Sequence, residues 1–150
     1  DKTLTSVKVI AHSEVKKNIF EKSEGHPYVL VKMCSTIFNE LGDTEHKITP
    51  KHLERAHKKI VIELEKDFFN PMFHPISPKA KAMVFQLLKI GKKRFHFTDA
   101  VKTTHVSSQT VAPYLQELVR KGCLNKPERA TYEFFHSLFI DFLKRRAPTI

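Results

Sequence analysis

The placement of glycine and proline constrains the fold most strongly, because it divides the chain into short helical segments. The first break is Gly25-His26-Pro27, within the stretch EGHPYVL. Since glycine commonly ends a helix and proline is tolerated in its first turn, we expect one helix before this break and another after it. Similar signals at Thr49-Pro50 and Ser77-Pro78 open further helices. The pattern therefore predicts a mainly α protein.

Residues 1–75 are predicted to form a helical subdomain. Ser13 is a suitable N-cap for the first helix, the second follows Pro27 and ends at Gly42-Asp43, and the third begins at Thr49-Pro50. Residues 6–10 (SVKVI) alternate as a short strand does. The side chains expected to be buried are Val15, Ile19 and Phe20 in the first helix, Tyr28, Val31, Ile37, Phe38 and Leu41 in the second, and Leu53, His57, Ile60, Val61 and Leu64 in the third.

Residues 76–150 predict a different order of elements. These elements follow a proline-rich junction over residues 70–78, which we expect to pack against other side chains. The helices should begin at Ser77-Pro78, at a Thr98-Asp99 cap, at Ser107 or Ser108, and close to Leu138. Two short strands should flank a turn over residues 127–130. Helix, short helix, helix and hairpin is the order of a winged helix-turn-helix, which gives a mainly α fold with a small β-wing.

Charge is distributed unevenly between the two parts. Residues 1–78 hold 12 lysines and arginines against 11 acidic residues, whereas residues 79–150 hold 14 against 5. A strongly basic module indicates a polyanionic partner. The alternative is that these charges only form a solvated surface.

Several classes of protein are not indicated by the sequence. No run of 18 apolar residues occurs, so no membrane partner is expected, and DKTLTSVKVI has no signal-peptide pattern. Cys34 and Cys123 form no CxxC motif, which favours a reduced, cytoplasmic setting. The nine histidines show no metal-ligand spacing, since His52 and His57 are five residues apart. We therefore expect no metal site and no catalytic cysteine–histidine pair.

Two stretches together suggest a family. Gly25-His26-Pro27-Tyr28 lies between two predicted helices, and SSQTVAPYLQELVRKGCLNK spans residues 107–126. With these motifs, nearly all of the chain resembles the C-terminal part of archaeal P-loop ATPases of the AAA+/STAND type. The resemblance implies a helical lid-like subdomain over residues 1–75 and a winged helix over residues 76–150. It also implies an upstream ATPase core that binds ATP or ADP with Mg²⁺ and contacts this chain.

The resemblance implies that Gly25, His26 and Pro27 lie close to the nucleotide bound by that core. A helix N-terminus offers free N–H groups to phosphate, and His26 could donate to it as well. The alternative is a plain interhelical turn. The sequence has no arginine beside this motif, which argues against direct phosphate sensing. It also has no GxxxxGK[ST] motif, so we expect no enzyme activity and no cofactor in this chain itself.

Double-stranded DNA is the partner expected for the winged helix. Its second helix would enter the major groove, and its wing would touch the backbone or the minor groove. The residues expected to contact DNA are Lys92, Lys93 and Arg94 beside the motif, Ser107, Ser108, Gln109, Gln116 and Arg120 on the helix, and Lys126 and Arg129 on the wing.

Two residues complicate this interpretation. Pro113 would kink the helix if Ser108 is the cap but is tolerated if Thr110 is the cap. Glu117 brings negative charge to the same helix. The rival hypothesis is a regulatory module that packs on its own ATPase core or on a protein partner. A basic surface from Lys92 to Arg129 favours DNA, whereas an exposed apolar patch over Phe134, Phe135 and Phe139 favours a protein partner.

Overall fold

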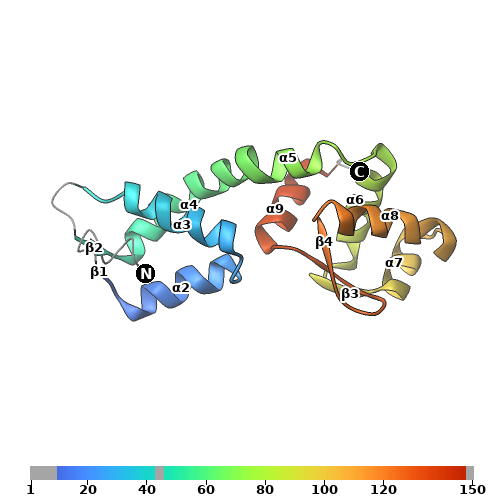
Figure 1. Ribbon diagram of the computed structural model, residues 1–150, viewed down its shortest axis with the longest axis horizontal. Helices are drawn as coiled ribbons and strands as arrows, with labels where there is room; N and C mark the ends of the chain where they lie inside the picture. Colours follow the sequence, from blue (N-terminus) through green and yellow to red (C-terminus); the bar gives the residue numbers. More distant parts are fainter. Residues whose placement is uncertain (1–9, 43–45, 148–150) are drawn as a thin grey trace. The chain divides into compact units, whose positions relative to one another are not determined.

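The computed structural model describes residues 10–42 and 46–147 and is mainly helical, with one small antiparallel sheet (Figure 1). Its internal contacts divide the chain into a first unit, residues 1–65, and a second unit, residues 66–150. The boundary expected from the sequence followed residue 75. Residues 66–75 group with the second unit because Phe69 and Phe73 pack on its C-terminal helix.

In the described residues of the first unit, the chain forms three helices and a two-stranded parallel sheet. The helices are α2 (Ser13–Ser23), α3 (Pro27–Asn39) and α4 (Pro50–Leu64), and the strands are β1 (Ile10–Ala11) and β2 (Lys47–Ile48). His12, not Ser13, is the N-cap residue of α2. Of the strand expected over residues 6–10, only Ile10 lies within the described residues, and Asp43 lies outside them.

The predicted start of α4 is confirmed. Thr49 is the N-cap, Pro50 is the first helical residue, and His52 completes a capping box. The Nδ1 atom of His52 accepts a hydrogen bond from the Thr49 N–H over 2.9 Å. His52 is buried for this reason, whereas His57, which the sequence placed on the buried stripe, is exposed.

The buried face of α3 was predicted correctly at Ile37, which is fully buried, but wrongly at Tyr28 and Val31. Tyr28 and Val31 are 40% and 68% exposed, and the buried residues of α3 are Val29, Met33, Thr36 and Ile37. Because apolar residues occur all around this helix, periodicity alone could not choose its inner face. Thr36 tolerates burial since its hydroxyl donates to the Lys32 carbonyl over 2.8 Å. Phe20 of α2, also expected inside, is 60% exposed.

The second unit contains a short π-helical turn, several helices and a three-stranded sheet. Its elements are the π-helical turn η1 (Glu65–Phe69), α5 (Asn70–Phe73), α6 (Pro78–Leu87), the 3₁₀ turn η2 (Leu88–Ile90), β3 (Arg94–His96), α7 (Phe97–Thr104), α8 (Ser108–Arg120), β4 (Leu124–Glu128), β5 (Thr131–Phe134) and α9 (Ser137–Arg146). The expected junction over residues 70–78 is thus helical in its first half.

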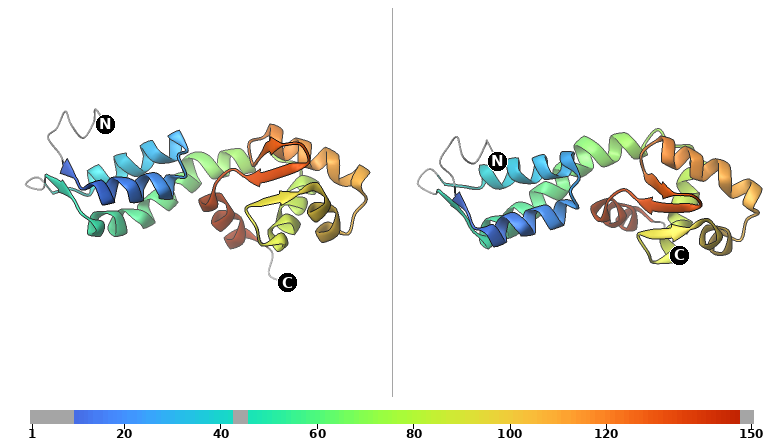
Figure 2. Two further views of the ribbon diagram at one scale, coloured as in Figure 1. Left: turned by 90° about the horizontal axis from the view of Figure 1, so that it is seen from below. Right: turned by 60° about the horizontal axis from the view of Figure 1, so that its bottom comes forward.

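Strand pairing in the second unit follows the order β3-β5-β4, with both pairs antiparallel, as Figure 2 shows. The predicted hairpin is present as β4 and β5. Strand β3, which pairs Arg94 with Glu133 and Phe95 with Tyr132, was not expected from the sequence. A three-residue strand is too short to show the alternation that identifies strands in a sequence.

Aromatic side chains form the centre of the second unit. Phe69 lies 5.6 Å from Phe139 and 5.5 Å from Phe142 between ring centroids, and Phe135 lies 5.0 Å from Phe139. Phe134, Phe135 and Phe139 are all buried. These three residues therefore do not form the exposed apolar patch that would have favoured a protein partner.

Two helix starts in this unit use histidine. His96, rather than Thr98-Asp99, is the N-cap of α7: its Nδ1 accepts from the Thr98 N–H, and the Asp99 carboxylate accepts from the His96 N–H. His136 caps α9 by accepting from the Leu138 N–H over 3.0 Å. With His52, these residues show that several of the histidines have a structural role. No helix among the described residues has the length and apolar character needed to cross a membrane.

Candidate nucleic-acid interface

Helix α8 and its N-cap residue together carry half of the residues expected to contact DNA. Ser107 is its N-cap, and the Ser107 Oγ accepts from the Thr110 N–H over 3.3 Å. The helix therefore begins before Thr110, and Pro113 lies inside it. Pro113 has no N–H to donate to the Gln109 carbonyl, which costs this helix one backbone hydrogen bond.

The two faces of α8 differ sharply in chemistry. Val111, Leu115 and Leu118 are fully buried and follow the i, i+4, i+7 spacing of one helix face. At 100° per residue, Gln109, Gln116 and Arg120 lie together on the opposite face. These three side chains are exposed. The helix thus presents a polar stripe with one arginine and with side chains able to bond base edges and phosphates.

Glu117 does not lie on this polar stripe. Its carboxylate accepts hydrogen bonds from the N–H and the hydroxyl of Ser77, each 2.9 Å long. These bonds, the backbone one foremost, lower the pKa of the Glu117 carboxyl. The negative charge of Glu117, which counted against DNA binding in the sequence, is therefore bound to Ser77 at the start of α6. Sequence reasoning missed this contact, because Ser77 and Glu117 are far apart in the chain.

The basic run before and within β3 is partly neutralised. Lys93 Nζ lies 3.8 Å from the Glu133 carboxylate, and an Arg94 guanidinium nitrogen lies 3.3 Å from it. Strand register explains the second pair, since Arg94 stands opposite Glu133 across β3 and β5. Lys92 is exposed and precedes the strand. Of the three predicted cations in this run, two share one carboxylate.

The β4–β5 hairpin holds the remaining two predicted residues. Lys126 and Arg129 are exposed, and the Lys126 ammonium lies 5.6 Å from the Tyr132 ring centroid. The turn is tight, with Ala130 at φ 58°. The Phe97 N–H donates to the Ala130 carbonyl over 2.7 Å, so the turn is fixed to the start of α7. Arg129 is therefore held at a defined position.

All ten residues predicted to contact DNA lie in the second unit, on three elements or beside them. Lys93 is half-buried and the others are exposed. They belong to the start of the sheet (Lys92, Lys93, Arg94), to α8 and its cap (Ser107, Ser108, Gln109, Gln116, Arg120), and to the hairpin (Lys126, Arg129). Residues 66–150 hold 15 lysines and arginines against 6 acidic residues, a net charge of +9.

The Gly25-His26-Pro27 stretch forms a closed turn between α2 and α3. Glu24 and Gly25 have φ angles of 54° and 69°, and the Gly25 N–H donates to the Phe20 carbonyl over 3.4 Å. The His26 N–H donates to the Ser23 carbonyl over 3.0 Å, and Pro27 begins α3. These contacts account for the motif as an interhelical turn. Proximity of the three residues to a nucleotide stays a prediction.

Other chemistry receives little support from the part of the chain that the structure describes. There, no three or more histidine, cysteine, aspartate or glutamate side chains are placed to hold a metal ion. Burial raises the pKa of the Cys123 thiol to about 12, so this cysteine is a poor nucleophile. Burial also raises the pKa of Cys34.

Comparison with known proteins identifies no family for this chain. No protein-family model, no curated protein and no solved structure matches it. Its function therefore has to be inferred from its own residues and their geometry.

Proposed function

We propose that the second unit is a winged helix-turn-helix that binds double-stranded DNA. The observation that carries this proposal is the division of α8 into a buried apolar face and an exposed polar stripe of Gln109, Gln116 and Arg120. A helix packed on one side only, with base-reading and phosphate-binding side chains on the other, suits insertion into the major groove.

In this proposal α7 and α8 form the helix-turn-helix, and the β4–β5 hairpin is the wing. Ser107 and Ser108 at the N-terminus of α8 bind phosphate, since hydroxyls and helix N-termini are common phosphate contacts. Gln109, Gln116 and Arg120 approach base edges. Arg129 at the hairpin turn and Lys126 beside it contact the backbone. Lys92 adds a further phosphate contact.

The positive charge of the second unit supports a polyanionic partner. Each phosphate neutralised lowers the log–log slope of affinity against salt by about 0.9. Contacts from Lys92, Arg120, Lys126 and Arg129 therefore predict a slope of about −3 to −4. Lys93 and Arg94 are left out of this predicted slope, because both pair with Glu133.

The first unit acts, in this proposal, as the lid of a P-loop ATPase whose core binds ATP or ADP with Mg²⁺ in the cytoplasm. Support comes from the resemblance at Gly25-His26-Pro27 and from the three-helix arrangement beside that turn. Nucleotide state moves the lid, and the lid moves the DNA-binding unit. The exposed aromatic patch that would have favoured the rival interaction-module hypothesis is not found, because Phe134, Phe135 and Phe139 are buried.

Fluorescence anisotropy with labelled duplex DNA across a salt series tests the proposal. Wild-type protein should bind with a steep salt dependence, and Arg120→Ala and Arg129→Ala should each weaken binding about fivefold to tenfold. Lys58→Ala on α4 is the matched control: it removes one exposed charge from the first unit and should change affinity less than about twofold. Absence of binding at low salt, or equal effects of all three variants, would refute DNA recognition by α8 and the hairpin.

A further inference from the structure

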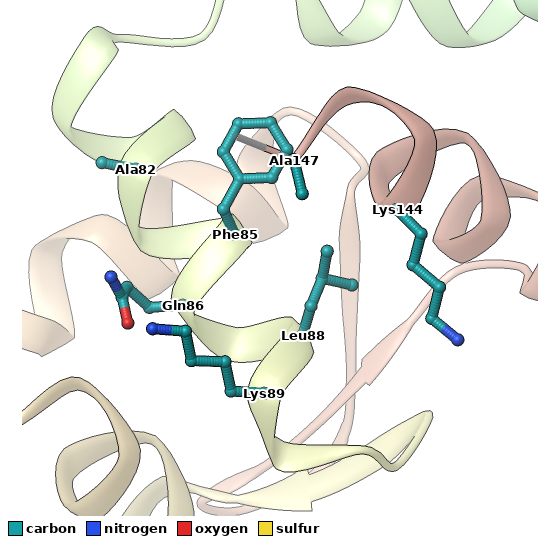
Figure 3. A pocket seen from close by; sticks show the side chains of 7 residues that line it. All are labelled: Ala82, Phe85, Gln86, Leu88, Lys89, Lys144 and Ala147. Atoms are coloured by element: carbon teal, nitrogen blue, oxygen red, sulfur yellow. The ribbon is translucent and has the colours of Figure 1, made fainter. Parts of the chain in front are cut away.

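A groove open to solvent lies between α6 and α9 of the second unit (Figure 3). It has a volume of about 350 Å³. Ala82, Phe85 and Leu88 line it from α6 and η2, and Ala147 lines it just after α9. In Figure 3 the Phe85 ring lies beside Ala147, and the Leu88 side chain points toward the middle of the view. The centre of the groove is therefore apolar.

The apolar wall is fixed in place by the aromatic core. The Phe85 ring lies 5.9 Å from the Phe73 ring in an edge-to-face arrangement, and Phe73 lies 5.9 Å from Phe142 of α9. Aromatic pairs at these distances favour defined relative orientations. Phe85 is thus held from behind while one side of it faces the groove. A preformed apolar surface of this kind costs little to order when a ligand binds.

The rim of the groove is cationic. Lys89 and Lys144 are exposed and line it from opposite sides, and no aspartate or glutamate is among its lining residues. Lys144 also begins the run Lys144-Arg145-Arg146 at the end of α9. Two ammonium groups beside an apolar floor attract a ligand that combines an anionic head with an apolar body.

We propose that this groove binds a small anionic amphiphile, namely a carboxylate attached to an aliphatic or aromatic body. The body contacts Phe85 and Leu88, and the carboxylate accepts a hydrogen bond from Lys144, while Lys89 adds positive charge on the other side of the rim. The volume lies at the lower end of the range for small-molecule sites, which favours a small ligand over a folded partner. The site shares no residue with the proposed DNA contacts, so the two proposals stand or fall separately.

Titration of the full chain, ¹³C-labelled at its methyl groups, with sodium octanoate tests the site by NMR. The Ala82, Leu88 and Ala147 methyl signals should shift together and saturate, with a Kd on the order of 1 mM for so small a ligand. Octanol, which lacks the charge, should bind about tenfold more weakly. Ala82→Trp fills the groove and should abolish the saturable shifts.

Two matched charge reversals locate the anionic head. Lys144→Glu should weaken octanoate binding about tenfold, whereas Lys79→Glu, on α6 but outside the groove lining, should change it less than about twofold. Absence of saturable shifts, equal affinity for octanol, or equal effects of the two reversals would overturn the proposal. Tighter binding of an acidic peptide with a phenylalanine anchor would also overturn it, by making the occupant a peptide. Circular dichroism checks that each variant folds. The comparison of octanoate with octanol uses the wild-type protein, so it tests the proposal even if a variant does not fold.

Discussion

The carboxylate of Glu117 on α8 accepts two hydrogen bonds from Ser77, the N-cap residue of α6, each over 2.9 Å. The Ser77 hydroxyl also accepts from the Ala80 N–H over 3.3 Å. One serine therefore both caps its own helix and joins it to α8. Since α6 supports the buried face of α8, this contact fixes the helix proposed to enter DNA.

Removal of either partner should destabilise the protein. Ser77→Ala should lower the free energy of unfolding by about 1–2 kcal/mol, because it removes the cap and one of the two bonds to Glu117. Glu117→Gln should lower it by about 1 kcal/mol, because glutamine keeps only one acceptor oxygen for the two Ser77 donors and that oxygen is uncharged. Urea denaturation of both single variants and the double variant measures their coupling. Strictly additive effects would contradict a direct interaction between the two side chains.

The same contact predicts a pH dependence. Hydrogen bonds from Ser77 hold the pKa of Glu117 below its ordinary value of 4.5. A carboxyl whose pKa is lowered by folding stabilises the folded state fully above its unfolded pKa and loses this contribution as the pH falls through the folded pKa. We therefore expect the free energy of unfolding to decrease as the pH is lowered from about 4.5. This decrease should be less steep in Glu117→Gln than in the wild type. Identical slopes would show that Glu117 does not contribute.

Glu133 should limit DNA affinity, because it pairs with both Lys93 and Arg94. Glu133→Gln removes this competition and should tighten DNA binding about threefold at low salt, with a steeper salt dependence. The control is the same change in a background in which Lys93 and Arg94 are both alanine, where most of the gain should disappear because neither cation is left to release. A full gain in that background would mean that Glu133 acts only through the net charge.

Local signals explain which parts of the fold could be predicted from the sequence. Thr49-Pro50 and Ser77-Pro78 each place a capping side chain directly before a proline, and both begin helices in the structure. The hairpin was also predictable, since the turn and its two strands lie within a dozen residues. Such features depend on neighbours in the chain, and so a single sequence can reveal them.

Features that depend on distant partners could not be predicted. The burial of His52 was missed for a local reason instead: His52 completes the capping box of Thr49, and histidine is not among the usual residues of that motif. The sequence placed Glu117 among the complications for DNA binding, whereas its partner Ser77 lies 40 residues away. The candidate contacts on α8 followed from helical periodicity, but the pairing of Arg94 with Glu133 required the unpredicted strand β3.

Replacement of Pro113 should stabilise the second unit. Pro113 lies inside α8 and is exposed, so alanine fits there and restores an N–H donor for the Gln109 carbonyl. Pro113→Ala should raise the free energy of unfolding by about 1–2 kcal/mol. The change removes the cost of a proline inside a helix, and part of this gain is lost because alanine gives the unfolded chain more conformational entropy than proline does.

Pro27→Ala is the matched control, because Pro27 occupies the first position of α3, where its missing N–H costs nothing. This change should leave stability unchanged or lower it slightly. Thermal and urea unfolding of both variants, followed by circular dichroism, gives the comparison. If Pro113→Ala destabilises the protein instead, the proline holds α8 in a bent form that the rest of the second unit requires. The proposed approach of α8 to DNA would then depend on that bend.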